Sequence, residues 1–168
     1  MPISMFQASV PVLTRGLRSL SAILEKAMAS AEARKIDPTV LVGARLSPDM
    51  FSLGRQVQIA SDTAKGAAAR LAAVEVPSWP DTETNFAELQ ARIAKTIDYL
   101  ATFKAEQMDG AEDRAITLKT AEGDIAGTGQ SFLLNFALPN FFFHLATAYG
   151  ILRHNGVAVG KRDFLGAP

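Results

Sequence analysis

The segment Leu138–Lys161, LPNFFFHLATAYGILRHNGVAVGK, is the densest apolar stretch of the chain and contains both of its histidines. Pro139 suits the first turn of a helix, where a missing N–H costs nothing. Asn155-Gly156 suits the end of that helix, because glycine tolerates the left-handed conformation. Between these limits, apolar residues recur at helical steps of three and four: Leu138, Phe141, Phe142, Leu145, Ala148, Tyr149 and Leu152. This spacing predicts a core helix of a helical bundle.

Three earlier segments show the same helical spacing of apolar residues. They predict helices over roughly residues 5–35, 48–74 and 83–107, with a short helical turn or linker over 38–46. Ser4 and Gln7 have the form of a capping box, and Ser47-Pro48 resembles an N-cap followed by an N1 proline. Trp79 lies in a proline-flanked connector, where we expect it to plug one end of the bundle.

Residues 107–130 differ in composition, being rich in Gly, Asp, Glu and Thr. The alternation in Ala115–Lys119 is typical of a strand, and the Glu122–Asp124 segment supplies a turn. This pattern predicts a β-hairpin, with a disordered loop as the alternative. The chain as a whole is therefore expected to be a single domain, residues 1–168, of the all-α class. Its predicted architecture is a four-helix bundle with a small β-hairpin before the last helix.

Charge and composition exclude several classes of partner and chemistry. Lys plus Arg and Asp plus Glu each number 17, so the zero net charge provides no basic field for nucleic acid or an anionic membrane. The absence of cysteine excludes disulfides, a thiolate nucleophile and cysteine ligation of zinc. No apolar run reaches the ~18 residues of a membrane span without polar interruptions, and the N-terminal residues lack a signal-peptide pattern. We therefore expect a cytoplasmic protein.

His144 is the first candidate for chemistry, because it lies on the shoulder of the apolar stripe of the last helix. It could be a core histidine bonded to a neighbouring helix, a catalytic or pocket residue, or a metal ligand. Ala148 occupies the position where an H-x-x-x-H pair would place its second histidine. In the second predicted helix, Arg55, Gln58 and Asp62 line a polar face. A solvated surface is the simplest interpretation of that face.

Several longer motifs carry a family resemblance: RQVQIASDTAKGAAARLA, FAELQARIAKTIDYL, LPNFFFH, ILRHNGV and GKRDFLG. With them the chain resembles a bacterial domain-of-unknown-function family within the DinB/YfiT-like four-helix-bundle superfamily. The resemblance covers nearly the whole chain. It implies an up-down-down-up topology, in which the connector over residues 75–84 crosses the length of the bundle. Ten extended residues span at most ~33–36 Å, enough to pass a 20-residue helix of about 30 Å.

The resemblance also implies a divalent metal site, with Zn²⁺ or Ni²⁺ as the expected ion. In DinB/YfiT-like relatives three histidines often hold the metal, one from the second helix and two from the fourth. His144 matches the first histidine of the fourth-helix pair, but Ala148 replaces the second. The second helix has no histidine, leaving Gln58 and Asp62 as polar candidates, so the implied site is incomplete. A cavity between helices two and four is expected to survive, rimmed by His144, Gln58, Asp62, Tyr149 and Arg55.

Three functions remain open from the sequence. The first is a small-ligand-binding bundle, expected to be dimeric, with a degenerate metal site. The second is a transferase or hydrolase in which His144 acts as general acid or base, oriented by Asp62 or Gln58. The third is a structural or interaction module, since Phe143 lies opposite the apolar stripe and needs cover from the hairpin, the C-terminal tail or a partner chain.

Overall fold

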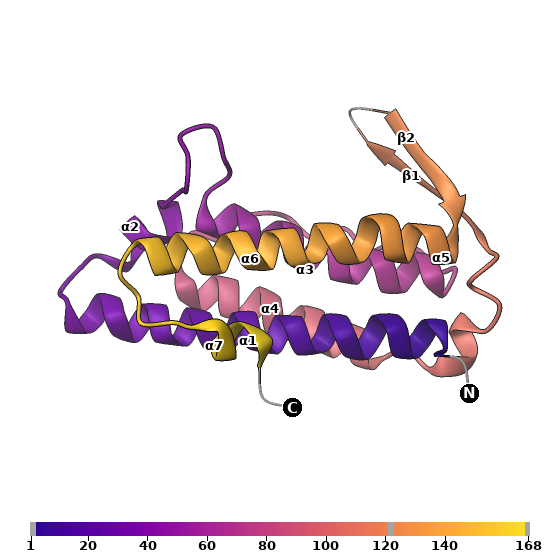
Figure 1. Cartoon of the computed structure of the whole chain (residues 1–168), viewed down its shortest axis with the longest axis horizontal. Coiled ribbons are helices and arrows are strands. Elements are labelled where there is room, and N and C mark those ends of the chain that lie inside the picture. Colours follow the sequence, from indigo (N-terminus) through magenta and orange to yellow (C-terminus); the bar gives the residue numbers. More distant parts are fainter. Residues whose placement is uncertain (1–2, 121–122, 167–168) are drawn as a thin grey trace.

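Figure 1 shows the computed structural model, which describes residues 3–120 and 123–166. Four long helices form the bundle: α1 (Met5–Ala33), α3 (Leu53–Leu71), α4 (Phe86–Ala101) and α6 (Leu138–His154). The shorter elements are α2 (Pro38–Gly43), the 3₁₀ turn η1 (Ala105–Met108), β1 (Ala115–Thr120), β2 (Gly123–Thr128), α5 (Gly129–Phe132), the π-helical turn η2 (Leu133–Ala137) and α7 (Lys161–Leu165). The predicted four-helix bundle with a small hairpin before the last helix is confirmed.

The four long helices run in the up-down-down-up order that the resemblance implies (Figure 1). After α3 ends, the connector over residues 72–85 returns along the side of the same helix. Trp79 meets Lys65, with the ammonium 4.5 Å from the ring centroid, and Asp81 then reaches Arg55 near the start of α3. Helix α4 therefore begins beside the first turn of α3 and runs parallel to it. The expectation that Trp79 plugs one end of the bundle is wrong, since its ring packs edge-to-face on Tyr99 at 6.0 Å along the bundle side.

Local capping decides where the first helix begins. Ser4 and Gln7 form the predicted capping box, with the Gln7 amide nitrogen 3.2 Å from the Ser4 hydroxyl. Because this cap fixes the N-terminus, Pro11 lies inside a continuous helix rather than at its start.

Two other helices are shorter than predicted. Helix α3 begins at Leu53 rather than 48, because residues 44–52 form a loop closed by a hydrogen bond from the Leu53 amide to the Ala44 carbonyl, 2.9 Å long. Helix α4 spans Phe86–Ala101 rather than 83–107, and Asn85 caps it by accepting the Glu88 amide at 2.9 Å.

The last helix is longer than the predicted core helix. Helix α5, the π turn η2 and α6 follow one another without a break from Gly129 to His154. The predicted stop at Asn155-Gly156 is confirmed, and Gly156 adopts a φ of 80°.

The antiparallel hairpin pairs Ala115 with Thr128 and Thr120 with Gly123, and it projects away from the bundle at the end where α5 begins (Figure 1).

The core lies between the four long helices. The largest side chains that are fully enclosed there are aliphatic, apart from Phe141 of α6. Small residues of α3 bring its neighbours close, since Ala60, Ala64 and Ala68 are fully buried. Within residues 3–120 and 123–166, no helix has both the length and the apolar character needed to cross a membrane.

Candidate functional site

His144 lies inside the bundle and is bonded to α3. Its side chain is buried, and Nδ1 lies 2.6 Å from Oε1 of Gln56. The amide nitrogen of Gln56 donates to the Phe51 carbonyl at 3.1 Å, which fixes the orientation of the amide. Oε1 must therefore accept the hydrogen bond, and the proton of the imidazole is assigned to Nδ1. The expected partners have other bonds, since Asp62 pairs with Arg92 and the Gln58 amide donates to Glu83.

The surroundings of His144 keep its imidazole neutral. Burial lowers the pKa of His144 to about 4, and the positive charge of Arg55 acts in the same direction. Burial disfavours the charged form of a base because water no longer solvates it. At neutral pH the ring is therefore a hydrogen-bond donor at Nδ1 and carries no charge.

The donors around His144 do not fit the metal site that the resemblance implies. Zinc in proteins is generally held by at least three side chains. Ala148 offers no ligand one turn further along α6, and the oxygen of Gln56 already accepts the Nδ1 proton. Among the residues that the structure describes, no three His, Cys, Asp or Glu side chains are grouped so that they could hold a metal ion. An imidazole–amide hydrogen bond occupies the position at which the resemblance implies metal ligation.

The polar face predicted on α3 is occupied by a charge network rather than by solvent alone. Its centre is Arg92 of α4, whose side chain is only 2% exposed. The guanidinium lies 2.9 Å from carboxylate oxygens of Asp62, Asp81 and Glu83. Lys65 also lies 2.8 Å from Asp62. Asp62 therefore forms ion pairs with cations on two helices, Lys65 of α3 and Arg92 of α4.

The remaining predicted site residues have other partners. Arg55 pairs with Asp81 and donates to Gln58 at 3.2 Å, while the Gln58 amide donates to Glu83 at 2.9 Å. Burial alone would raise the pKa of Glu83, but hydrogen bonds from Arg92 and Gln58 hold it below its ordinary value. Tyr149 packs on Phe164 of α7, with ring centroids 6.1 Å apart. These contacts fasten the crossover connector and the C-terminal segment to the bundle.

A groove of about 850 Å³ lies between α3 and the α5–η2–α6 segment, the same two long helices between which the resemblance implies a cavity. The residues of α3 that line this groove recur at helical spacing, and they include Arg55, Ile59, Asp62 and Arg70. From Arg55 to Arg70 the wall is about 22 Å long at 1.5 Å per residue. The hairpin and the connector form the other sides. Of the expected rim residues, His144, Gln58 and Tyr149 do not line this groove, although Asn140, one turn before His144, does.

The opposite wall of the groove contains the π-helical turn. Phe132, Phe136 and Ala137 line the groove there, and the two phenyl rings stack with centroids 5.9 Å apart. A π turn inserts an extra residue into a helix, and such turns occur frequently at functional sites. Here the turn lies on the groove wall, beside a hydrogen bond from Asn140 to the Thr63 hydroxyl of 2.9 Å that links the two walls. The groove is therefore apolar on one side and charged on the other.

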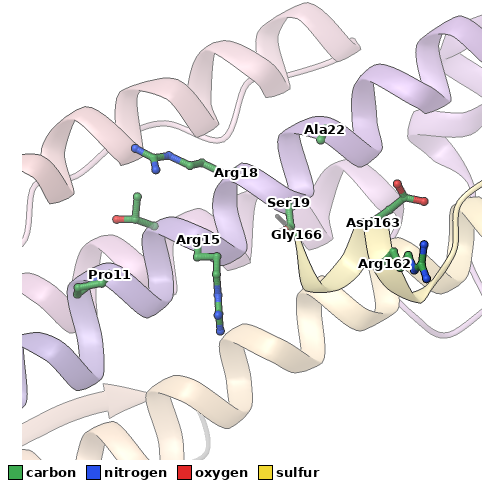
Figure 2. Close-up of a pocket in the computed structure, with 9 residues that line it drawn as sticks. Pro11, Arg15, Arg18, Ser19, Ala22, Arg162, Asp163 and Gly166 are labelled. Atoms are coloured by element: carbon green, nitrogen blue, oxygen red, sulfur yellow. The ribbon is translucent and has the colours of Figure 1, made fainter. Parts of the chain in front are cut away.

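A second groove, of about 770 Å³, lies between α1 and α7. Figure 2 shows that its arginines do not converge, since Arg15 and Arg18 extend in different directions and Arg162 lies apart from both, beside Asp163. All three arginines are exposed. This surface offers no arrangement that would surround a ligand from several sides.

The chain is similar to a known family and to a solved structure over almost its whole length. A model of the domain of unknown function DUF1993 matches residues 5–165. The chain belongs to the DUF1993 family. It is also similar to the crystal structure of a DinB family member protein from Shewanella denitrificans, with 44% identity and a TM-score of 0.92. That match covers 98% of this chain and 93% of the other. No curated protein matches the sequence.

Sequence reasoning missed three residues that organise the site of this DUF1993 protein: Gln56, Arg70 and Arg92. Gln56 could have been noticed, because it lies within the apolar stripe of α3, three residues after Leu53 and four before Ala60. A polar side chain at such a position must find a buried partner. Arg92 gave a similar signal, being three residues after Leu89 and next to Ile93. Arg70 gave none, since arginine near the end of a helix is ordinary.

Proposed function

We propose that this DUF1993 protein is a small-ligand-binding bundle whose ligand lies in the groove between α3 and the α5–η2–α6 segment. The observation that carries the proposal is the groove itself, whose volume of about 850 Å³ falls within the range of small-molecule sites. It combines stacked Phe132 and Phe136 with polar groups of α3. Apolar walls with a few convergent polar groups are typical of sites for small molecules.

The state of His144 supports binding rather than metal-dependent chemistry. His144 is bonded to Gln56, and the side chains around His144 do not provide the three ligands of a metal site. A histidine with a pKa of about 4 is also a weak base at neutral pH, whereas efficient acid–base catalysis wants a pKa near the working pH. The residues around it therefore favour a binding role with a degenerate metal site.

The proposal predicts that filling the groove abolishes ligand binding. Ile59 lines the groove and is half-buried, so Ile59→Trp should occupy the space that a ligand would use. The neutral dye phenylnaphthylamine, excited directly and followed by its emission, should bind the unaltered protein saturably. We expect Ile59→Trp to weaken that binding by roughly tenfold or more, equivalent to about 1.4 kcal/mol.

The matched control adds the same side chain to the other groove. Ala22 is exposed and lines the groove between α1 and α7, so Ala22→Trp should leave the affinity for the dye unchanged. Equal weakening by both tryptophans, or no saturable binding to any form of the protein, would refute a ligand site between α3 and α6.

A second candidate function is a transferase or hydrolase that uses His144. One observation favours it: with the proton on Nδ1, the lone pair of Nε2 has no hydrogen-bond partner among the described residues. A substrate donor could use that lone pair. An activity lost in His144→Ala and kept in His154→Ala would support this alternative.

A further inference from the structure

We propose that the groove ligand is a small organic anion with an apolar body. Its carboxylate, sulfonate or phosphate group is held by Arg70, and its body lies against Phe132 and Phe136. This inference rests on the proposed function, because it names the chemistry of a molecule bound in the same groove.

Arg70 is a half-buried cation without an anion. Among the described residues its guanidinium makes no hydrogen bond or ion pair, although it lies in the groove wall. By contrast, Arg55 and Lys65 on the same wall are paired with Asp81 and Asp62. Burial lowers the pKa of Arg70, and no carboxylate offsets this effect. A desolvated guanidinium gains most from a ligand that brings two oxygens, because its planar fork binds such groups bidentately.

The helix around Arg70 is shaped to hold its guanidinium against the wall. A Cβ atom on Gly66 would lie 2.4 Å from Nη1 of Arg70, and Val76 lies close to the same point. The Arg70 side chain therefore folds back across the surface of α3, over a position where only glycine leaves room. Glycine inside a helix costs about 1 kcal/mol relative to alanine. Gly66 therefore lowers the stability of the helix slightly, and it leaves the space that the Arg70 guanidinium occupies.

The remaining charge of the groove is also positive. Among the residues that the structure describes, four cationic side chains line it and one carboxylate, that of Asp62. Arg55 is paired with Asp81 and Lys65 with Asp62, and Lys119 of β1 lies opposite Asp124 in the strand register, so the guanidinium of Arg70 is left without a carboxylate among the described residues. The chain as a whole has zero net charge, so this excess is local. It attracts anions to a groove whose other wall carries the stacked Phe132 and Phe136.

The test uses two dyes that share their aromatic rings and differ in charge. Anilinonaphthalene sulfonate carries a sulfonate, and phenylnaphthylamine does not. We expect Arg70→Gln to weaken binding of the sulfonate dye by about tenfold or more, because the forked charge-assisted contact is lost, and to leave binding of the neutral dye unchanged. Gly66→Ala should fold at least as stably as the unaltered protein and should also weaken the sulfonate dye, because its methyl group displaces the guanidinium.

The control is Arg15→Gln, which removes an exposed arginine from the other groove. It should change neither affinity. If Arg70→Gln and Arg15→Gln weaken the sulfonate dye equally, the attraction is diffuse and the role of Arg70 is refuted. If both dyes bind the groove and Arg70→Gln alters neither, the anion inference fails while the proposed function stands. If Ile59→Trp affects neither dye, the proposed function fails as well.

Discussion

Replacing Arg92 with methionine should lower the free energy of unfolding by about 3–5 kcal/mol, the usual cost of removing one partner of a buried ion pair. The guanidinium contacts carboxylates of Asp62, Asp81 and Glu83 and donates to the Pro80 carbonyl at 3.1 Å. Three of these four groups belong to the connector over residues 72–85. Without the guanidinium, the Glu83 carboxylate, with a side chain only 12% exposed, loses its cation. The connector also loses its ion pairs with α4 and keeps the packing of Trp79 on Tyr99.

The measurement is the urea unfolding midpoint and its slope, followed by far-ultraviolet circular dichroism. Arg92→Lys should recover only part of the loss, because an ammonium cannot reproduce the forked contacts. The matched control is Lys26→Met, which breaks an ion pair with Asp163 on an exposed surface and should cost at most about 1 kcal/mol. Similar losses for Arg92→Met and Lys26→Met would contradict the structural role assigned to this network.

Acidification should destabilise the protein through His144 by about 2–3 kcal/mol. The unfolded chain binds a proton at this histidine near its ordinary pKa of 6.5, whereas the folded protein binds it only near a pKa of about 4. Between these values the unfolded state holds more protons, so the free energy of unfolding falls as the pH falls. The contribution is fully present above about pH 6.5 and is lost as the pH approaches about 4. Each unit of pKa shift corresponds to about 1.4 kcal/mol.

Urea unfolding of the unaltered protein and of His144→Leu, from about pH 7.5 to about pH 4, separates this effect from the rest. Carboxylates with lowered pKa, such as that of Glu83, contribute equally to both proteins and cancel in the comparison. His144→Leu should show a shallower loss of stability over this range. The exposed histidine provides the control, since His154→Leu should keep the full pH dependence. Parallel curves for the unaltered protein and His144→Leu would mean that the imidazole is solvated in the folded state.

Features fixed by nearby residues were predictable from the sequence. The capping box of Ser4 with Gln7, the cap of Asn85 on Glu88 and the stop at Gly156 involve contacts within four residues, so their residue types specify them. The hairpin is also local, because its paired strands lie close together in the sequence, while the turn predicted at Glu122 falls outside the described residues. The start of α3 was not predictable in this way, because Ser47-Pro48 suits an N-cap and only the packing of the loop over residues 44–52 moves the first helical residue to Leu53.

Features that depend on helix rotation were not predictable in the same way. Gln56 and Gln58 point about 200° apart on α3, and only the packing of α6 selects Gln56 as the partner of His144. The register of the crossover connector likewise decides that Asp81 and Glu83 reach Arg92. The π turn is invisible in the sequence, because Leu133–Ala137 has the composition of an ordinary helix. The groove wall was anticipated only at Arg55 and Asp62, and its unpaired cation, Arg70, was not.

The nitrogen resonances of the His144 ring test most directly whether this protein is a ligand-binding bundle with a degenerate metal site or a metal-binding protein. A long-range proton–nitrogen correlation spectrum at neutral pH distinguishes the two tautomers and reports metal binding at either ring nitrogen. We expect the neutral form with its proton on Nδ1, and we expect these resonances to stay in place when one equivalent of Zn²⁺ is added. A stoichiometric zinc-induced shift of the Nε2 resonance, absent in His144→Ala, would contradict a degenerate metal site.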